Sequence, residues 1–162
     1  MSTHNLFVHR ADGTAEPASS REILSAARAV LEHRVRRGAA LQSPQKVGEY
    51  LTMRLGHLDY ECFGLVLVDN RHRVIECVEL FRGTIDGASV HPREVIKLLL
   101  EKEAAGAIAY HNHPSGVKDQ SHADEIITRK LVDAFAAVDA RLIDHVICAG
   151  PHILSFAQEG LL

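Results

Sequence analysis

The chain has 162 residues, of which 46% are hydrophobic and 24% are charged, and its formal net charge is −3. This length and composition suffice for one domain with a real core and do not comfortably hold two. The slightly acidic balance gives no general electrostatic reason to bind nucleic acid or an anionic membrane. No apolar run is long enough to span a bilayer, so we expect no membrane association.

The N-terminus and the cysteines both indicate a cytoplasmic protein. Residues 1–5 lack the charged and apolar regions of a signal peptide. The three cysteines are widely separated and set among apolar residues, at Cys62, Cys77 and Cys148. Their odd number and surroundings are typical of reduced core thiols, and they form no zinc motif.

Residues 1–40 are predicted to form an N-terminal extension that contains one helix. The residues before Pro17 are weakly apolar, and we expect them to be mobile. The helix covers about residues 20–37, with its apolar residues on one side, and ends at Gly38. Its C-terminal end is basic, through Arg34, Arg36 and Arg37. Either these cations lie on a solvated face that the helix dipole favours, or they contact a phosphate backbone.

A second helix and a pair of strands are predicted next. Ser43 and Pro44 suit the cap and first turn of a helix that runs to about Leu55. Two apolar runs follow, over residues 63–68 and 74–80, and a short polar turn separates them. This pattern favours two paired strands.

Helices and strands alternate in the rest of the chain. Pro92 opens a helix that leads to a strand over residues 107–110, as a crossover helix would. Another helix begins near residue 121, and the last strands cover about residues 141–148 and 152–156. This order favours an α/β fold with a mixed sheet, and propensity alone leaves the strand order open.

The most informative segment directly follows the strand over residues 107–110, and it reads His111-Asn112-His113-Pro114-Ser115-Gly116. Side chains two residues apart along a strand point the same way. His111 and His113 therefore present both imidazoles to one side. Pro114 and Gly116 then stop the strand.

A carboxylate is the third candidate metal ligand. Ser121 suits the cap of a helix whose apolar positions recur at helical spacing up to Val138, which places Asp124 in the first turn. The intervening turn brings this helix start back to His111 and His113. Two imidazoles and one carboxylate leave a fourth tetrahedral position for water, as in a catalytic zinc site. Imidazole nitrogen favours zinc over magnesium or calcium and leaves iron and manganese open.

Each part of this pattern also has a simpler explanation. Ser121-x-x-Asp124 alone resembles a capping box with Asp in place of Glu or Gln. A close pair of histidines is weak evidence by itself, because the chain contains 11 histidines. Asn112 either orients the loop through its amide or only continues the strand. His122 and His145 are expected to be structural or solvated rather than a fourth ligand.

In combination, the histidine segment and the serine–aspartate pair resemble the JAMM signature of the JAB/MPN metalloproteases. The closer resemblance is to the bacterial RadC-like branch of that family, and it covers about residues 43–150. Further support comes from the position of Glu61 before an apolar run and from the segments at residues 83–85, 90–95 and 144–147. The chain is thus identified as a member of this branch.

The resemblance implies a fold and a domain boundary. JAB/MPN domains have a mixed β-sheet flanked by helices, a three-layer sandwich like that of cytidine deaminases, so we expect this α/β architecture here. The metal-dependent hydrolase domain would cover residues 41–162. One departure is local, because residues 117–120 replace the Pro-containing linker that is usual in the family. The departure bears on the shape of the loop more than on metal binding.

The resemblance also implies a role for each site residue. His111, His113 and Asp124 would be the ligands of one zinc ion. Glu61 would be the acid/base that acts on zinc-bound water, and Ser121 would hydrogen-bond the developing oxyanion. Zinc lowers the pKa of bound water to about 7, and a nearby carboxylate then accepts and passes on its proton. Sequence pattern alone does not bring Glu61 to the metal, and the runner-up carboxylates are Glu76, Glu79 and Glu94.

The implied function is that of a zinc metallopeptidase or isopeptidase with a peptide or isopeptide substrate. The alternative is a RadC-type protein associated with DNA repair, or a noncatalytic module that binds a protein or a nucleic acid. Longer family members carry a helix-hairpin-helix module before this domain, and residues 1–40 show no Gly-centred hairpin of that kind. The intact ligand set favours the enzyme, while the substrate and the oligomeric state stay open.

Overall fold

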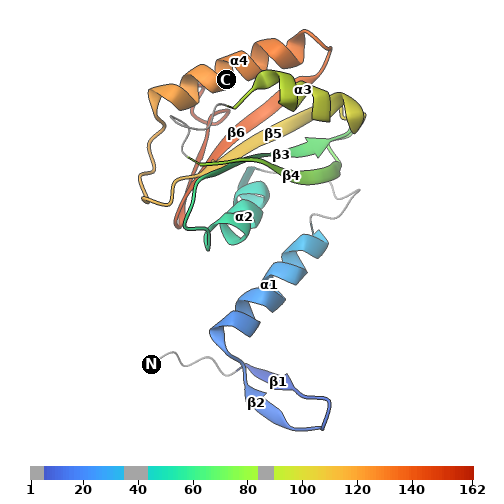
Figure 1. Cartoon of the computed structure of the whole chain (residues 1–162), viewed down its shortest axis with the longest axis vertical. Helices are drawn as coiled ribbons and strands as arrows, with labels where there is room; N and C mark the ends of the chain where they lie inside the picture. The colour runs from blue at the N-terminus through green and yellow to red at the C-terminus, as the bar shows by residue number, and fades with distance from the viewer. Residues whose placement is uncertain (1–5, 35–43, 84–89) are drawn as a thin grey trace. The chain divides into compact units, whose positions relative to one another are not determined.

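The computed structural model describes residues 6–34, 44–83 and 90–162 (Figure 1). The chain divides into two compact units, Met1–Arg34 and Val35–Leu162. Several predicted features lie outside the described residues: the helix end near residue 37, its stop at Gly38, the domain boundary after residue 40, and Ser43. Within the described ranges, no helix is both long enough and apolar enough to cross a membrane.

The first unit is a β-hairpin followed by a helix. β1 (Phe7–His9) pairs antiparallel with β2 (Ala15–Pro17), and α1 spans Ser20–Arg34. Gly13, at a φ of 85°, follows Asp12 in the turn, and this dipeptide is a strong hairpin signal because glycine tolerates positive φ.

The structure therefore has a hairpin where the sequence predicted mobile residues before Pro17. Side chains tie this hairpin to the helix that follows it. The guanidinium of Arg10 lies 3.3 Å from the carboxylate of Glu16 and 3.0 Å from that of Glu22 in α1. These ion pairs and the turn dipeptide are the local features that the hydropathy pattern did not reveal.

The second unit contains a five-stranded mixed sheet with the order β4-β3-β5-β6-β7. β5 and β6 pair in parallel, and all the other neighbours pair antiparallel. β3 and β5 are buried along their whole length, which explains their continuous apolar sequences. The strands span Cys62–Val68 (β3), Val74–Arg82 (β4), Gly106–Asn112 (β5), Arg141–Ala149 (β6) and His152–Ser155 (β7).

Helices cover both faces of this sheet. α3 (Pro92–Glu101) and α4 (His122–Ala136) lie together on one face, and α2 (Pro44–Leu55) lies on the opposite face (Figure 1). The resulting three layers confirm the predicted α/β fold, a mixed sheet flanked by helices. The parallel pair β5 and β6 is joined by α4, as a crossover connection requires.

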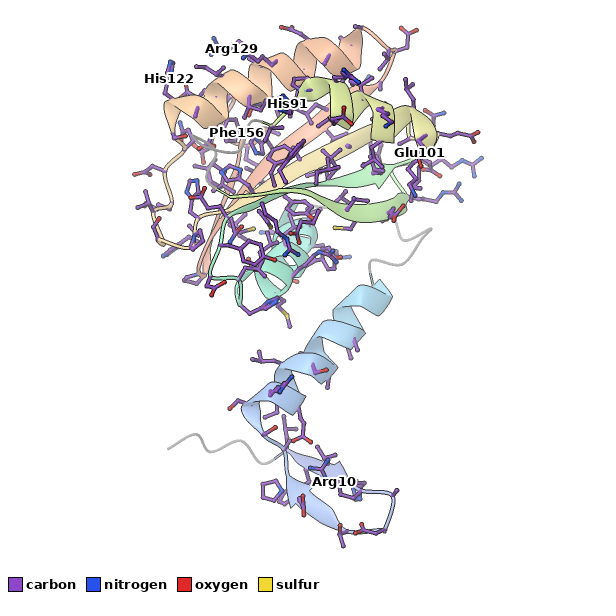
Figure 2. The ribbon with its side chains drawn as sticks, viewed as in Figure 1. Arg10, His91, Glu101, His122, Arg129 and Phe156 are labelled. Atoms are coloured by element: carbon purple, nitrogen blue, oxygen red, sulfur yellow. The ribbon has the colours of Figure 1, made fainter. Side chains whose placement is uncertain are left out.

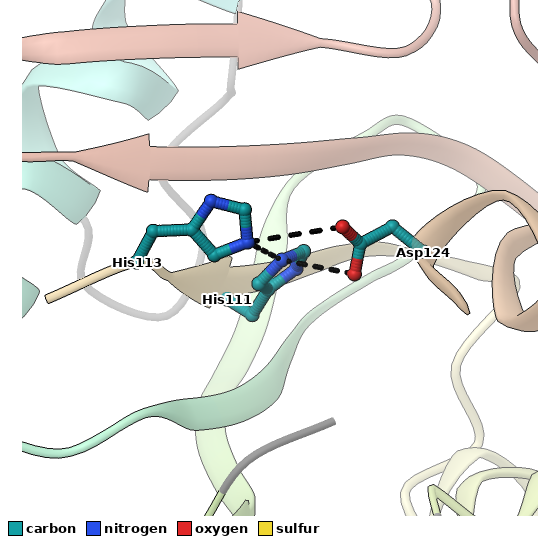
Figure 3. Close-up of side chains that lie close together, drawn as sticks. All are labelled: His111, His113 and Asp124. Atoms are coloured by element: carbon teal, nitrogen blue, oxygen red, sulfur yellow. Dashed lines mark hydrogen bonds and ion pairs between the residues drawn. The ribbon is translucent and has the colours of Figure 1, made fainter. Parts of the chain in front are cut away.

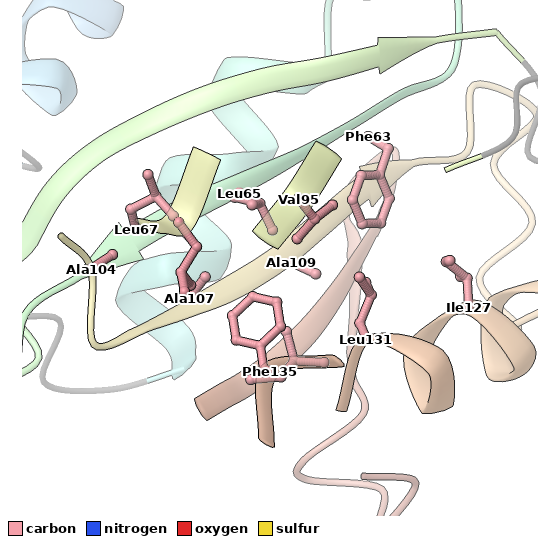
Figure 4. Packing of buried hydrophobic residues seen from close by; sticks show 12 residues of the cluster. Phe63, Leu65, Leu67, Val95, Ala104, Ala107, Ala109, Ile127, Leu131 and Phe135 are labelled. Atoms are coloured by element: carbon pink, nitrogen blue, oxygen red, sulfur yellow. The ribbon is translucent and has the colours of Figure 1, made fainter. Parts of the chain in front are cut away.

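The core between the sheet and the α3/α4 layer positions the candidate site (Figure 4). Alternate residues of β5, Ala107 and Ala109, join this core together with Leu131 and Phe135 of α4. Burying a side chain such as Leu131 contributes about 1.5–3 kcal/mol. Because side chains alternate along a strand, His111 is the next residue on the same face and points toward the α4 layer.

Candidate metal centre

The two histidines of the site sit at the end of β5. His111 is the sixth residue of the strand Gly106–Asn112, and His113 keeps the extended path because its N–H donates to the carbonyl oxygen of Cys148 at 2.8 Å. Both imidazoles therefore project to one side, as the spacing predicted. Their Nε2 atoms lie 3.0 Å apart (Figure 3).

Asp124 approaches these rings from the first turn of α4. Ser121 is the N-cap of that helix, and its hydroxyl oxygen accepts from the backbone N–H of Asp124 at 3.2 Å. In return, Oδ2 of Asp124 accepts from the N–H and the hydroxyl of Ser121 at 2.7 and 2.8 Å. The capping box that the sequence left as an alternative is thus present, and it orients the carboxylate.

The second carboxylate oxygen faces the histidines. Oδ1 of Asp124 lies 3.2 Å from Nε2 of His111, and Oδ2 lies 3.7 Å from Nε2 of His113. Asp124 is fully buried, yet Oδ1 has no hydrogen-bond partner among the described residues. Burying a carboxylate oxygen without a partner costs free energy.

These atoms fit a metal ion. Each residue offers one ligand atom, and the ligand atoms of His111, His113 and Asp124 all lie within 4.8 Å of one another. Two imidazole nitrogens and a carboxylate oxygen are typical zinc donors, and a cation between them would satisfy the unpaired Oδ1. A buried His-His-Asp group that is able to bind a metal is therefore a feature of this fold.

Burial keeps the imidazole of His111 in the neutral form, which is the form that binds metal. Desolvation, with a smaller effect of the neighbouring His113, lowers the pKa of His111 to about 3. Desolvation also lowers the pKa of the fully buried His145 well below its ordinary value. A neutral imidazole carries the lone pair that a metal requires, so His111 needs no deprotonation at neutral pH.

The Nδ1 atoms of both candidate ligand histidines have defined partners. Nδ1 of His113 lies 2.7 Å from the carbonyl oxygen of Val117, which only accepts, so Nδ1 carries the proton and Nε2 the lone pair. Nδ1 of His111 lies 2.9 Å from Nε2 of His145. Contacts of this kind fix the orientation of metal-binding imidazoles.

Glu61 directly precedes β3, which is the strand next to β5. Phe63 of β3 pairs with His111 of β5, and Glu61 lies two residues before Phe63, so its backbone lies near the end of β5 that carries the histidines. The backbone on each side of Glu61 is held by the buried amide of Asn112. Oδ1 of Asn112 accepts from the N–H of Cys62 at 2.8 Å, and Nδ2 of Asn112 donates to the carbonyl oxygen of Tyr60 at 2.9 Å.

Asn112 therefore does more than continue the strand, which settles the choice that the sequence left open. The backbone of Glu61 has a further contact, because its carbonyl oxygen accepts from the N–H of Gly83 at 2.9 Å. The acid/base role of Glu61 stays a prediction, as does the contact of the exposed Ser121 with an oxyanion.

The runner-up carboxylates form ion pairs elsewhere. Glu76 lies 2.8 Å from the ammonium of Lys102, and Glu79 lies 2.6 Å from the guanidinium of Arg82. Glu94 lies 3.6 Å from the side chain of its neighbour Arg93. None of the three belongs to the metal-binding group found among the described residues.

The two remaining histidines have different surroundings. His122 is exposed and lies on the outer side of α4, as Arg129 does (Figure 2). His145 is fully buried and stacks on Phe156, with ring centroids 4.9 Å apart. His122 is thus solvated and His145 is part of the core, as expected, and His145 also contacts His111, a candidate ligand. The sequence gives no local signal for this contact, because β6 and β5 are distant in the chain.

Comparison with known proteins adds the family context. A sequence model of the family described as "RadC-like JAB domain" matches residues 41–161. Over 150 residues, the chain is 50%, 49% and 46% identical to UPF0758 proteins of Thioalkalivibrio sulfidiphilus, Nitrosococcus oceani and Marinobacter nauticus. Each match covers 93% of this chain and 67% of the relative. The matched family region contains the whole five-stranded sheet and the metal-binding group.

Proposed function

This chain belongs to the RadC-like JAB domain family, as its motif predicted, and on that premise we propose that it is a zinc-dependent hydrolase of peptide or isopeptide bonds. The observation that carries the proposal is the unpaired, fully buried Oδ1 of Asp124 beside the Nε2 atoms of His111 and His113. A carboxylate oxygen and two lone-pair nitrogens that face one another are stabilised by a cation bound between them.

The residues around the metal group have the chemistry of amide hydrolysis. When bound, zinc supplies a Lewis acid that polarises a carbonyl and makes water a stronger acid. Glu61 would accept the proton of the attacking water and return it to the leaving nitrogen, and the amide of Asn112 holds its backbone in place. Ser121 is exposed, so its hydroxyl can turn from Asp124 to donate to the oxyanion.

The metal content of the purified protein tests the first part of the proposal. We expect about one zinc per chain in the wild type and none in His113→Ala or Asp124→Ala, as measured by elemental mass spectrometry. His122→Ala is the matched control, because this exposed histidine lies on the outer side of α4. A wild-type protein that stays metal-free after zinc reconstitution would contradict the proposal.

The substitution Glu61→Gln tests the second part. We expect it to retain zinc and to lower kcat on a peptide or isopeptide substrate by about two to four orders of magnitude, because it removes the proton acceptor. Substrates are screened as libraries of peptides and ε-amino-linked peptides. A zinc-loaded wild type that cleaves none of them, and that binds a protein or duplex DNA as tightly as Glu61→Gln does, would favour the noncatalytic module.

A further inference from the structure

A buried chain of hydrogen bonds connects two members of the metal-binding group, His111 and Asp124, through residues outside that group. It starts at Nδ1 of His111 in β5, passes through His145 in β6 and Thr128 in α4, and ends at the backbone carbonyl of Asp124. The three distances are 2.9, 2.6 and 2.6 Å. Neither His145 nor Thr128 belongs to the metal-binding group.

The direction of every bond in this chain follows from its last acceptor. The carbonyl oxygen of Asp124 can only accept, so the hydroxyl of Thr128 must donate to it. The single hydroxyl proton is then used, and the Thr128 oxygen must accept from Nδ1 of His145. A neutral His145 protonated at Nδ1 has a bare Nε2, which accepts from Nδ1 of His111.

We propose that Thr128 and His145 are positioning residues that hold His111 in the one tautomer whose Nε2 is free to bind the metal. The inference rests on the proposed zinc site. Without the hydroxyl of Thr128, the neutral His145 can carry its proton on its own Nε2 instead and donate it to Nδ1 of His111. The proton of His111 then occupies Nε2, the atom that faces Asp124 and His113.

This chain of hydrogen bonds, here called the relay, depends on every one of its members, because little water can reach the buried side chains to replace a missing partner. The exposed fractions of His111, Thr128 and His145 are 1%, 1% and 0%. The rings of Phe63 and Phe156 flank His145, with centroids 5.7 and 4.9 Å from its own. Apolar walls leave the Thr128 oxygen as the partner of Nδ1, so one hydroxyl sets the tautomers of two imidazoles.

The substitutions Thr128→Val and Thr128→Ser separate the hydroxyl from the volume of the side chain. In a competition assay against a chromophoric chelator, we expect Thr128→Val to weaken zinc binding about 10- to 100-fold. Thr128→Ser should keep the wild-type affinity, because it keeps the hydroxyl. Thr52→Val is the matched control in α2, a threonine whose hydroxyl oxygen is also buried and lies outside the relay.

The tautomers themselves provide a readout that needs no metal. In long-range ¹H–¹⁵N spectra of the metal-free protein, we expect His145 to be protonated at Nδ1 in the wild type and at Nε2 in Thr128→Val. If the wild type and Thr128→Val bind zinc with equal affinity, the positioning role is wrong and the proposed function is unaffected. An Nε2–H tautomer of His145 in the wild type would also overturn the positioning role. Absence of zinc binding in the wild type would instead count against the proposed function.

Discussion

Asp124 serves two purposes with its two carboxylate oxygens. Oδ2 completes the capping box with Ser121, and Oδ1 is left buried beside His111 without a hydrogen-bond partner among the described residues. The first contact stabilises the start of α4, whereas the second arrangement is unfavourable until a cation arrives. Asp124 thus stabilises the helix with Oδ2 and keeps Oδ1 unpaired, so that this oxygen can bind a metal ion.

The substitution Asp124→Asn should separate these purposes. We expect it to abolish zinc binding and to raise the free energy of unfolding of the metal-free protein by about 1–3 kcal/mol, because the amide nitrogen donates to Nε2 of His111 while the amide oxygen keeps the cap. Urea unfolding of the metal-free proteins measures the change. Asp124→Ala is the control, since it loses the cap as well and should be less stable than the wild type. If Asp124→Asn is less stable than the metal-free wild type, this explanation is wrong.

The buried thiols should make stability depend on alkaline pH. Burial, with a smaller effect of Glu79, raises the pKa of Cys62 from 9.0 to about 12, and burial raises that of Cys148 to about 12. The unfolded chain ionises first as the pH rises. The contribution of these thiols is therefore complete below about pH 9 and is lost between about pH 9 and 12.

Urea unfolding over this pH range measures the loss, and the double variant Cys62→Ala/Cys148→Ala should show a weaker pH dependence than the wild type. Buried thiols should also resist a thiol reagent in the folded protein, so we expect labelling of both only after unfolding. Rapid labelling of either cysteine in a folded Cys77→Ala background would show that the thiol is accessible and that its pKa is not raised by burial.

At the scale of elements, the close packing of β3 between β4 and β5 depends on a residue without a side chain. Gly64 pairs with Tyr110 across β3 and β5, next to a register shift between β3 and β4. The Tyr110 hydroxyl crosses this position to donate to the carbonyl oxygen of Val78 at 3.1 Å. A Cβ at residue 64 would overlap both the hydroxyl and that carbonyl oxygen.

We expect Gly64→Ala to destabilise the protein by about 3 kcal/mol, since one of its neighbours is backbone and the other a buried ring that cannot move aside. Gly48→Ala is the matched control. Its nearest neighbours would all be side-chain atoms of the half-exposed Ile153, with the terminal methyl group closest, so its effect should stay within about 1 kcal/mol. Thermal unfolding of both variants measures the difference. Equal stability of the two variants would show that the sheet relaxes around the new methyl group.

At the scale of the whole molecule, the residues of the site and the core all belong to the second unit, Val35–Leu162. The family region over residues 41–161 lies within it. The described ion pairs of Arg10 connect parts of the first unit to each other. The predicted division into an extension and a hydrolase domain is therefore open to a direct test.

We expect deletion of residues 1–34 to leave the zinc content and the main unfolding temperature of the remaining chain unchanged, because the described hydrophobic core and the metal-binding group consist of residues of the second unit. Elemental analysis and calorimetry of the shortened chain measure both quantities. The full chain carrying His113→Ala provides the metal-free reference. A clear fall in the unfolding temperature of the shortened chain would show that the first unit stabilises the second.

The features that the sequence predicted correctly are those that depend on neighbours in the chain. The spacing of His111 and His113 places both rings on one side of a strand, and the capping box of Ser121 orients Asp124, because alternation and helix caps are local geometry. The apolar runs likewise marked the strands and helices of the sheet unit. Composition alone missed the N-terminal hairpin, although its Asp12-Gly13 turn was a visible signal.

The distant residues that meet around the metal-binding group are brought together by the tertiary structure. The register of β3 on β5 brings the segment that precedes β3, with Glu61, to the histidine end of β5, and the parallel pairing of β5 with β6 brings His145 to His111. Thr128 completes that contact from α4. Strand order and register arise from packing of the whole sheet against its helices, a nonlocal balance of burial and hydrogen bonding that no short stretch of sequence encodes.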